Sequence, residues 1–144
     1  MTDERPTRER PYAIGEHRLF YTHGDVPVIV YRGDVAPEQA AAIVDFTGHG
    51  SRLEAVIADV QELGAFGAKT RKALIDTSRR QVHLTVMDLF VVISGANVVR
   101  RAVMTMVTTA ARLVTTRRIT VHHTQTLDEA LVAIDEHLAA RRST

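Results

Sequence analysis

The sequence predicts an α/β fold with a mixed, mostly parallel five-stranded sheet and about four helices, in the order ββαβαβαβα. Two apolar runs, within Leu53–Asp59 and Asp88–Ser94, have the continuous hydrophobicity that is typical of strands covered on both faces. A segment rich in strand-forming residues precedes them, and helical patterns alternate with the later strands. Strands that are linked in this way by helices must pair in parallel.

The first two strands are expected to form an antiparallel hairpin. The segments 17–23 (HRLFYTH) and 26–32 (VPVIVYR) are rich in β-branched and aromatic residues, and Gly24-Asp25 between them favours a tight turn. Pro27 has no N–H group, so it should lie near the beginning of its strand or face solvent.

Four later segments are expected to be helices, and three of them carry apolar residues at spacings that are typical of helices packed on a core. The last one starts with a capping box, because Thr126 is followed by Glu129 three residues later. A short strand is expected over 119–124. The helices are expected over Pro37 to Gly48, from Ala68 to the low eighties, over Asn97 to Thr115, and from Thr126 to the end of the domain.

Length and composition predict a single domain over residues 12–141. The chain has 144 residues, of which 45% are hydrophobic, enough for one sizeable core. Residues 1–11 contain six charged residues and two prolines, a composition that predicts a flexible arm. Residues 142–144 are expected to fray at the other end.

The composition also excludes several classes of protein. The net charge of +1 is too balanced for a dedicated nucleic-acid binder, and the 5% of aromatic residues offers few stacking platforms. The chain has no cysteine and no run of about 18 apolar residues, so it lacks disulfides and integral membrane spans. We therefore expect a cytoplasmic protein without nucleic-acid or integral membrane partners.

The loop after the strand that ends at Asp59 is the expected functional surface. Loops of this kind lie beside free N–H groups at the start of the next helix. Glycines in the loop permit positive φ and close approach of a partner, and cationic side chains follow them. The expected partner-binding residues are Asp59, Gly64, Gly67, Ala68, Lys69, Thr70 and Arg71, with Gly95 and Asn97 from the neighbouring strand end.

No catalytic centre, cofactor or metal site is predicted. Asp59 and Glu62 are accompanied by no histidine, so a turn-stabilising Asp and an exposed Glu are expected rather than an acid-base pair. Ser94 lacks a nucleophile-elbow pattern and is expected to cap a helix or form a turn. His122 and His123 are adjacent on a strand and point to opposite faces, which argues against a shared metal.

Three segments carry a resemblance to a known family: YRGDV at 31–35, VIADVQELGAFGAKTRKAL at 56–74 and FVVISGANVVRR at 90–101. They resemble the STAS family, in particular stand-alone bacterial STAS-like proteins related to anti-sigma factor antagonists and to CRAL-TRIO-like domains. The resemblance implies a non-enzymatic domain for regulatory protein-protein interaction in signalling, with self-association as a homodimer in the same class. It also implies an alternative, a carrier of a small ligand or lipid of the CRAL-TRIO-like type.

The resemblance implies as well that the phosphorylation switch of this family is missing. Asp59 matches the Asp at the strand end, but Ala68 stands where switch members carry a phosphorylatable Ser. Thr70 offers an offset hydroxyl two residues further on. We therefore expect binding that is constitutive or controlled elsewhere, and the sequence does not identify the partner.

Overall fold

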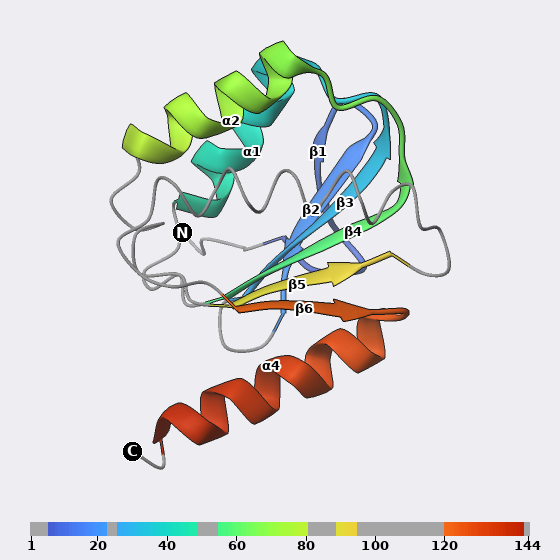
Figure 1. The fold of residues 1–144 in the computed structure, drawn as a ribbon. Helices are drawn as coiled ribbons and strands as arrows, with labels where there is room; N and C mark the ends of the chain where they lie inside the picture. The colour runs from blue at the N-terminus through green and yellow to red at the C-terminus, as the bar shows by residue number, and fades with distance from the viewer. Residues whose placement is uncertain (1–5, 23–25, 49–54, 81–88, 95–119, 143–144) are drawn as a thin grey trace, which may run out of the picture.

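The computed structural model describes residues 6–22, 26–48, 55–80, 89–94 and 120–142, and its core is one six-stranded sheet (Figure 1). The strands lie side by side in the same order as in the sequence. They are β1 (Tyr12–Ile14), β2 (His17–Tyr21), β3 (Pro27–Gly33), β4 (Ala55–Leu63), β5 (Leu89–Ile93) and β6 (Thr120–Thr124).

The sheet is mixed, which confirms the α/β class. β1, β2 and β3 pair antiparallel, whereas β3, β4, β5 and β6 pair parallel. The expected number of five strands is wrong, because β1 adds a sixth at the edge of the sheet. With three residues between Pro11 and Gly15, β1 is too short to produce a readable alternation. The turn expected at 24–25 lies outside the described residues.

The described residues contain three helices where about four were expected. They are α1 (Pro37–Gly48), α2 (Ala68–Arg80) and α4 (Leu127–Arg142). The helix expected over 97–115 lies outside the described residues. α1 and α2 cover one face of the sheet, and α4 lies against the other face (Figure 1). None of the helices in the described ranges is both long and apolar enough to cross a membrane.

Alternation along the strands supplies a hydrophobic core on each face. On the face of α1 and α2, Ile29, Val56 and Val92 pack with the apolar side of α1. On the face of α4, Val28, Ile57 and Val91 pack with the helix. Ile134 anchors α4 there, since its side chain is fully buried.

Thr126 caps the start of α4, as predicted. The backbone N–H of Glu129 donates to Thr126 Oγ1 over 3.1 Å, which satisfies a donor that a helix start otherwise leaves free. The Glu129 carboxylate accepts the N–H of Gln125 over 2.9 Å, one residue before the cap.

Residues 6–11 run beside β2. The carbonyl oxygen of Pro6 accepts the N–H of Tyr21 over 3.0 Å, and the backbones of Thr7 and Arg10 exchange two hydrogen bonds. This segment brings Arg8 and Pro11 to the sheet face that carries α4. A flexible arm over residues 1–11 stays a prediction.

Candidate functional site

The predicted surface loop is the segment Gly64–Gly67 between β4 and α2. The N–H of Gly64 donates to the carbonyl oxygen of Gly33 over 2.7 Å, and the carbonyl oxygen of Ala65 accepts the N–H of Val35 over 3.0 Å. The carboxylate of Asp34 accepts the N–H of Ala65 over 2.7 Å. Three hydrogen bonds therefore hold the loop against the segment Gly33–Val35, and we call these two segments together the pinned loop.

The two loop glycines have different structural roles. Neither adopts the positive φ that glycine permits; among the described glycines only Gly15 and Gly33 do. A Cβ atom on Gly64 would lie 2.7 Å from the carbonyl carbon of Gly33, so close approach requires glycine there. A Cβ atom on Gly67 would meet nothing within 4 Å. The fold therefore requires glycine at position 64, whereas nothing in the fold explains why position 67 is a glycine.

α2 begins at Ala68, as predicted. The N–H of Arg71 donates to the carbonyl oxygen of Gly67 over 3.0 Å, which is the first helical bond. Ala68 and Lys69 are exposed, and the first turn contains no acidic residue. The partly buried Arg71 reaches back to the carbonyl oxygen of Phe66 over 3.4 Å. The start of α2 is therefore a positively charged surface next to the pinned loop.

Thr70 belongs to the core side of this turn. Its side chain is 4% exposed, and Oγ1 donates to the carbonyl oxygen of Val35 over 2.7 Å. A kinase could reach this hydroxyl only if the turn opened and this bond broke. Thr70 thus adds a hydrogen bond that holds the first turn of α2 against the pinned loop.

The substitution Thr70→Val should lower the free energy of unfolding by about 1–2 kcal/mol. Valine keeps the shape of threonine but leaves the carbonyl oxygen of Val35 without this donor. Urea denaturation measures the change. Thr70→Ser is the control, since it retains the hydroxyl and should recover most of the loss. Equal stability of Thr70→Val and the unchanged protein would contradict the role of this bond.

Asp59 does not end its strand, contrary to expectation, because β4 continues to Leu63. Val30 pairs with Asp59 but Arg32 pairs with Glu62, so β4 contains one extra residue in a β-bulge. The Asp59 carboxylate accepts the backbone N–H of Gln61 over 3.1 Å and also its side-chain amide. The bulge leaves both Gln61 and Glu62 exposed before Leu63 returns to the core.

A pocket of about 550 Å³ lies beside this bulge. Its lining combines an apolar floor with a polar rim, and it includes residues from the N-terminal segment, β2, β3, β4, β5 and the start of α4. The lining residues are Arg8, Pro11, Arg18, Phe20, Val28, Val30, Arg32, Asp59, Gln61, Glu62, Ile93, Gln125, Thr126 and Leu127. We call it the arginine pocket, after its three arginines.

The predicted site residues that the structure describes lie on two opposite faces of the sheet. Asp59 lines the arginine pocket on the face of α4. Gly64, Gly67, Ala68, Lys69, Thr70 and Arg71 belong to the pinned loop and α2, on the other face. Gly95 and Asn97 lie outside the described residues. Ser94 is 1% exposed, and its N–H donates to the carbonyl oxygen of Thr124 over 3.1 Å.

Sequence reasoning missed the three arginines of the pocket. The alternation of side chains along two strands could have indicated two of them, because Arg18 and Phe20 on β2 share a face with Val30 and Arg32 on β3. The register of the hairpin is needed to use that signal, and the contribution of Arg8 depends on the path of residues 6–11.

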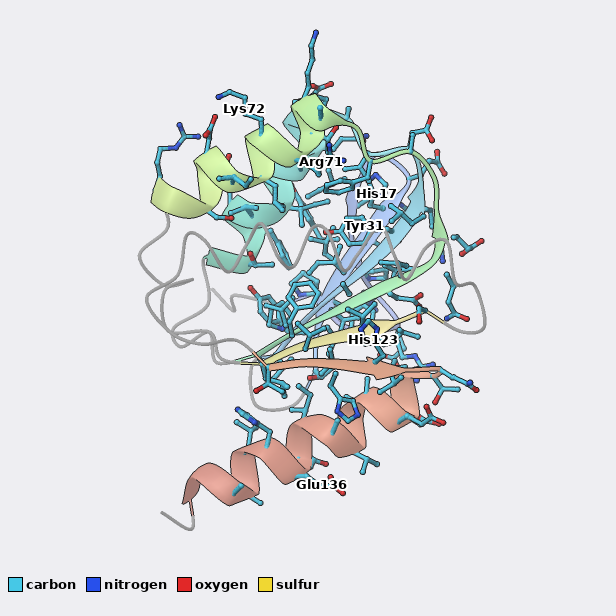
Figure 2. All side chains as sticks on the ribbon, in the orientation of Figure 1. His17, Tyr31, Arg71, Lys72, His123 and Glu136 are labelled. Carbon is cyan, nitrogen blue, oxygen red and sulfur yellow. The ribbon has the colours of Figure 1, made fainter. Side chains whose placement is uncertain are left out.

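A buried histidine supports the backbone at Arg32. The N–H of Arg32 donates to His17 Nδ1 over 3.0 Å. The ring proton of His17 is therefore on Nε2, which lies 3.3 Å from Gln39 Oε1 and donates to it. Tyr31 contacts the same ring edge-on, with 5.7 Å between centroids, and burial raises the pKa of its phenol above the ordinary value (Figure 2).

Within the described ranges, no group of three His, Asp or Glu side chains could hold a metal ion. Comparison of the chain with protein-family models, with curated proteins and with solved structures finds no match.

Proposed function

We propose that this chain is a non-enzymatic protein-interaction domain of the STAS-like type, and that its contact surface is the pinned loop with the first turn of α2. The observation that carries the proposal is the combination of exposure and fixation in this loop. Gly67, Ala68 and Lys69 are exposed, yet the residues on both sides of them are tied to the fold by Gly64 and Thr70. A surface held in one conformation loses little entropy when a partner binds.

Charge supports an acidic partner. Lys69 and Arg71 lie at the start of α2, where the helix dipole adds positive potential. Lys72 is also exposed, although it is 2.6 Å from Asp76 in an ion pair that neutralises part of its charge. Ala68 supplies no hydroxyl for phosphorylation, so binding in this proposal is constitutive or controlled elsewhere.

Site-specific crosslinking tests the surface directly. A photoreactive benzoylphenylalanine at Ala68 should crosslink a protein partner in cells, whereas the same residue at Val132 should not. Val132 is a matched position, because it is 57% exposed but lies on α4 at the other face. Crosslinking of the same partner from Val132 alone would place the surface elsewhere.

The affinity of the purified partner gives the second measurement. The double substitution Lys69→Glu and Arg71→Glu should raise the Kd at least tenfold, because it places acidic groups opposite an acidic partner. Arg80→Glu changes the charge in the same direction at the other, exposed end of α2 and should leave the Kd unchanged. An equal Kd for the double variant and the unchanged protein would contradict the proposal.

A further inference from the structure

The arginine pocket and the proposed contact surface lie on opposite faces of the sheet. Protein binding at the pinned loop and the first turn of α2 therefore does not involve the pocket. α4 packs against β4, β5 and β6. The pocket starts at the N-terminal end of α4, where Thr126 and Leu127 line it, and extends over β2 and β3. It therefore lies over β2 and β3, beside the main contacts of α4 with β4, β5 and β6.

The floor of the pocket is apolar because of the alternation in β2, β3 and β5. Phe20, Val28 and Ile93 point to this face and are buried. Val30 and Leu127 are partly buried and complete the floor. Phe20, Val28 and Ile93 expose at most 6% of their surface, so a ligand on this floor covers mainly Val30 and Leu127. Covering these two side chains removes apolar surface from water, which favours binding by about 25 cal/mol for each Å².

The rim of the pocket has more positive than negative charge. Arg8, Arg18 and Arg32 stand against two carboxylates, those of Asp59 and Glu62. Both carboxylates already have partners, since Asp59 accepts from Gln61 and Glu62 lies 3.6 Å from Arg32 Nε.

Donors remain on the arginines after these contacts. Arg18 uses Nη1 for the carbonyl oxygens of Gly15 and His17, over 2.9 and 3.0 Å. A guanidinium carries five N–H donors, so the Nε and Nη2 groups of Arg18 can still bind an anion. The contact of Arg32 with Glu62 likewise engages only Nε.

The size of the pocket restricts the ligand. A volume of about 550 Å³ lies within the range of sites for small organic molecules, about 300–1,000 Å³. An inorganic anion would leave the apolar floor uncovered, and a neutral hydrophobic molecule would leave the arginines without an acceptor. We propose that the arginine pocket binds a small organic anion, with its apolar body on Val30 and Leu127 and its acidic group at Arg8, Arg18 and Arg32.

Two dyes with the same body test the proposal. 1-Anilinonaphthalene-8-sulfonate carries an anionic group, and N-phenyl-1-naphthylamine is its neutral counterpart. Fluorescence titration should show one saturable site for the sulfonate, with a Kd at least tenfold below that of the neutral dye. Equal Kd values for the two dyes, or weak binding without saturation, would overturn the proposal.

Substitutions then locate the site. Arg8→Gln and Arg18→Gln should each raise the Kd of the sulfonate three- to tenfold and leave that of the neutral dye unchanged. Val30→Trp should fill the pocket and abolish binding of both dyes. If sulfonate binding is unchanged in the two arginine variants, the anion site is not in this pocket.

Two controls separate this result from other causes. Lys69→Gln removes a positive charge on the other face and should leave dye binding unchanged; a loss equal to that of Arg18→Gln would overturn the assignment. Because the sulfonate dye also binds partly unfolded proteins, each variant must keep the near-UV circular dichroism of the unchanged protein. Dye binding does not involve the protein partner, so the two proposals succeed or fail separately.

Discussion

Gly64→Ala should destabilise the protein by roughly 2–4 kcal/mol, whereas Gly67→Ala should change the stability by less than about 1 kcal/mol. The added Cβ at position 64 would meet Asp34 Oδ1 and would lie 2.7 Å from the carbonyl carbon of Gly33 and 2.9 Å from the backbone nitrogen of Asp34. These are main-chain atoms at the end of β3, so they cannot move without breaking the 2.7 Å bond between Gly64 and Gly33. At Gly67 the same atom enters open space.

Urea denaturation of the two variants measures this difference, and hydrogen exchange shows its location. The amide protons of Gly64, Ala65 and Val35 form the bonds of the pinned loop, so Gly64→Ala should accelerate their exchange more than that of β5. Affinity for the partner should fall together with this protection. Equal stability of the two alanine variants would show that the loop is not held as described.

Elements with a strong local pattern were predictable from the sequence. The buried runs of β4 and β5 contain apolar residues at every position, and the start of α4 carries its own cap in Thr126 and Glu129. The start of α2 at Ala68 follows from the same local reasoning. Each of these features is decided within a few residues, so neighbouring strands are not needed to recognise it.

Features that depend on pairing across the sheet were not predictable. Gln61 and Glu62 are polar and look like a loop, yet they continue β4 because Arg32 and Gly33 of β3 extend beside them. Asp59 lies on the face of α4 and β4 continues to Leu63, so Asp59 is separated from the loop that was expected to share its surface. The arginine pocket likewise needs the register of β2 against β3 and the path of residues 6–11.

The second large effect concerns the buried histidine, where His17→Ala should lower the free energy of unfolding by about 3 kcal/mol. The side chain of His17 is fully buried, and its loss would leave the N–H of Arg32 without its acceptor. It would also remove one of the two donors to Gln39 Oε1, the other being the N–H of Ala36. It would also leave a cavity against Tyr31, which packs on the imidazole.

His17→Asn separates the two hydrogen bonds of this network. An asparagine oxygen can take the place of Nδ1 and accept from Arg32, but it is too short to replace the donor to Gln39. We expect a free energy of unfolding between those of the unchanged protein and His17→Ala, measured by urea denaturation. Arg32 lines the arginine pocket, and its backbone N–H is held by His17. The alanine variant loses this bond, so it should also bind the sulfonate dye more weakly than the asparagine variant. Identical stabilities for both variants would show that packing against Tyr31, rather than the bond to Arg32, explains why the sheet has a histidine at this position.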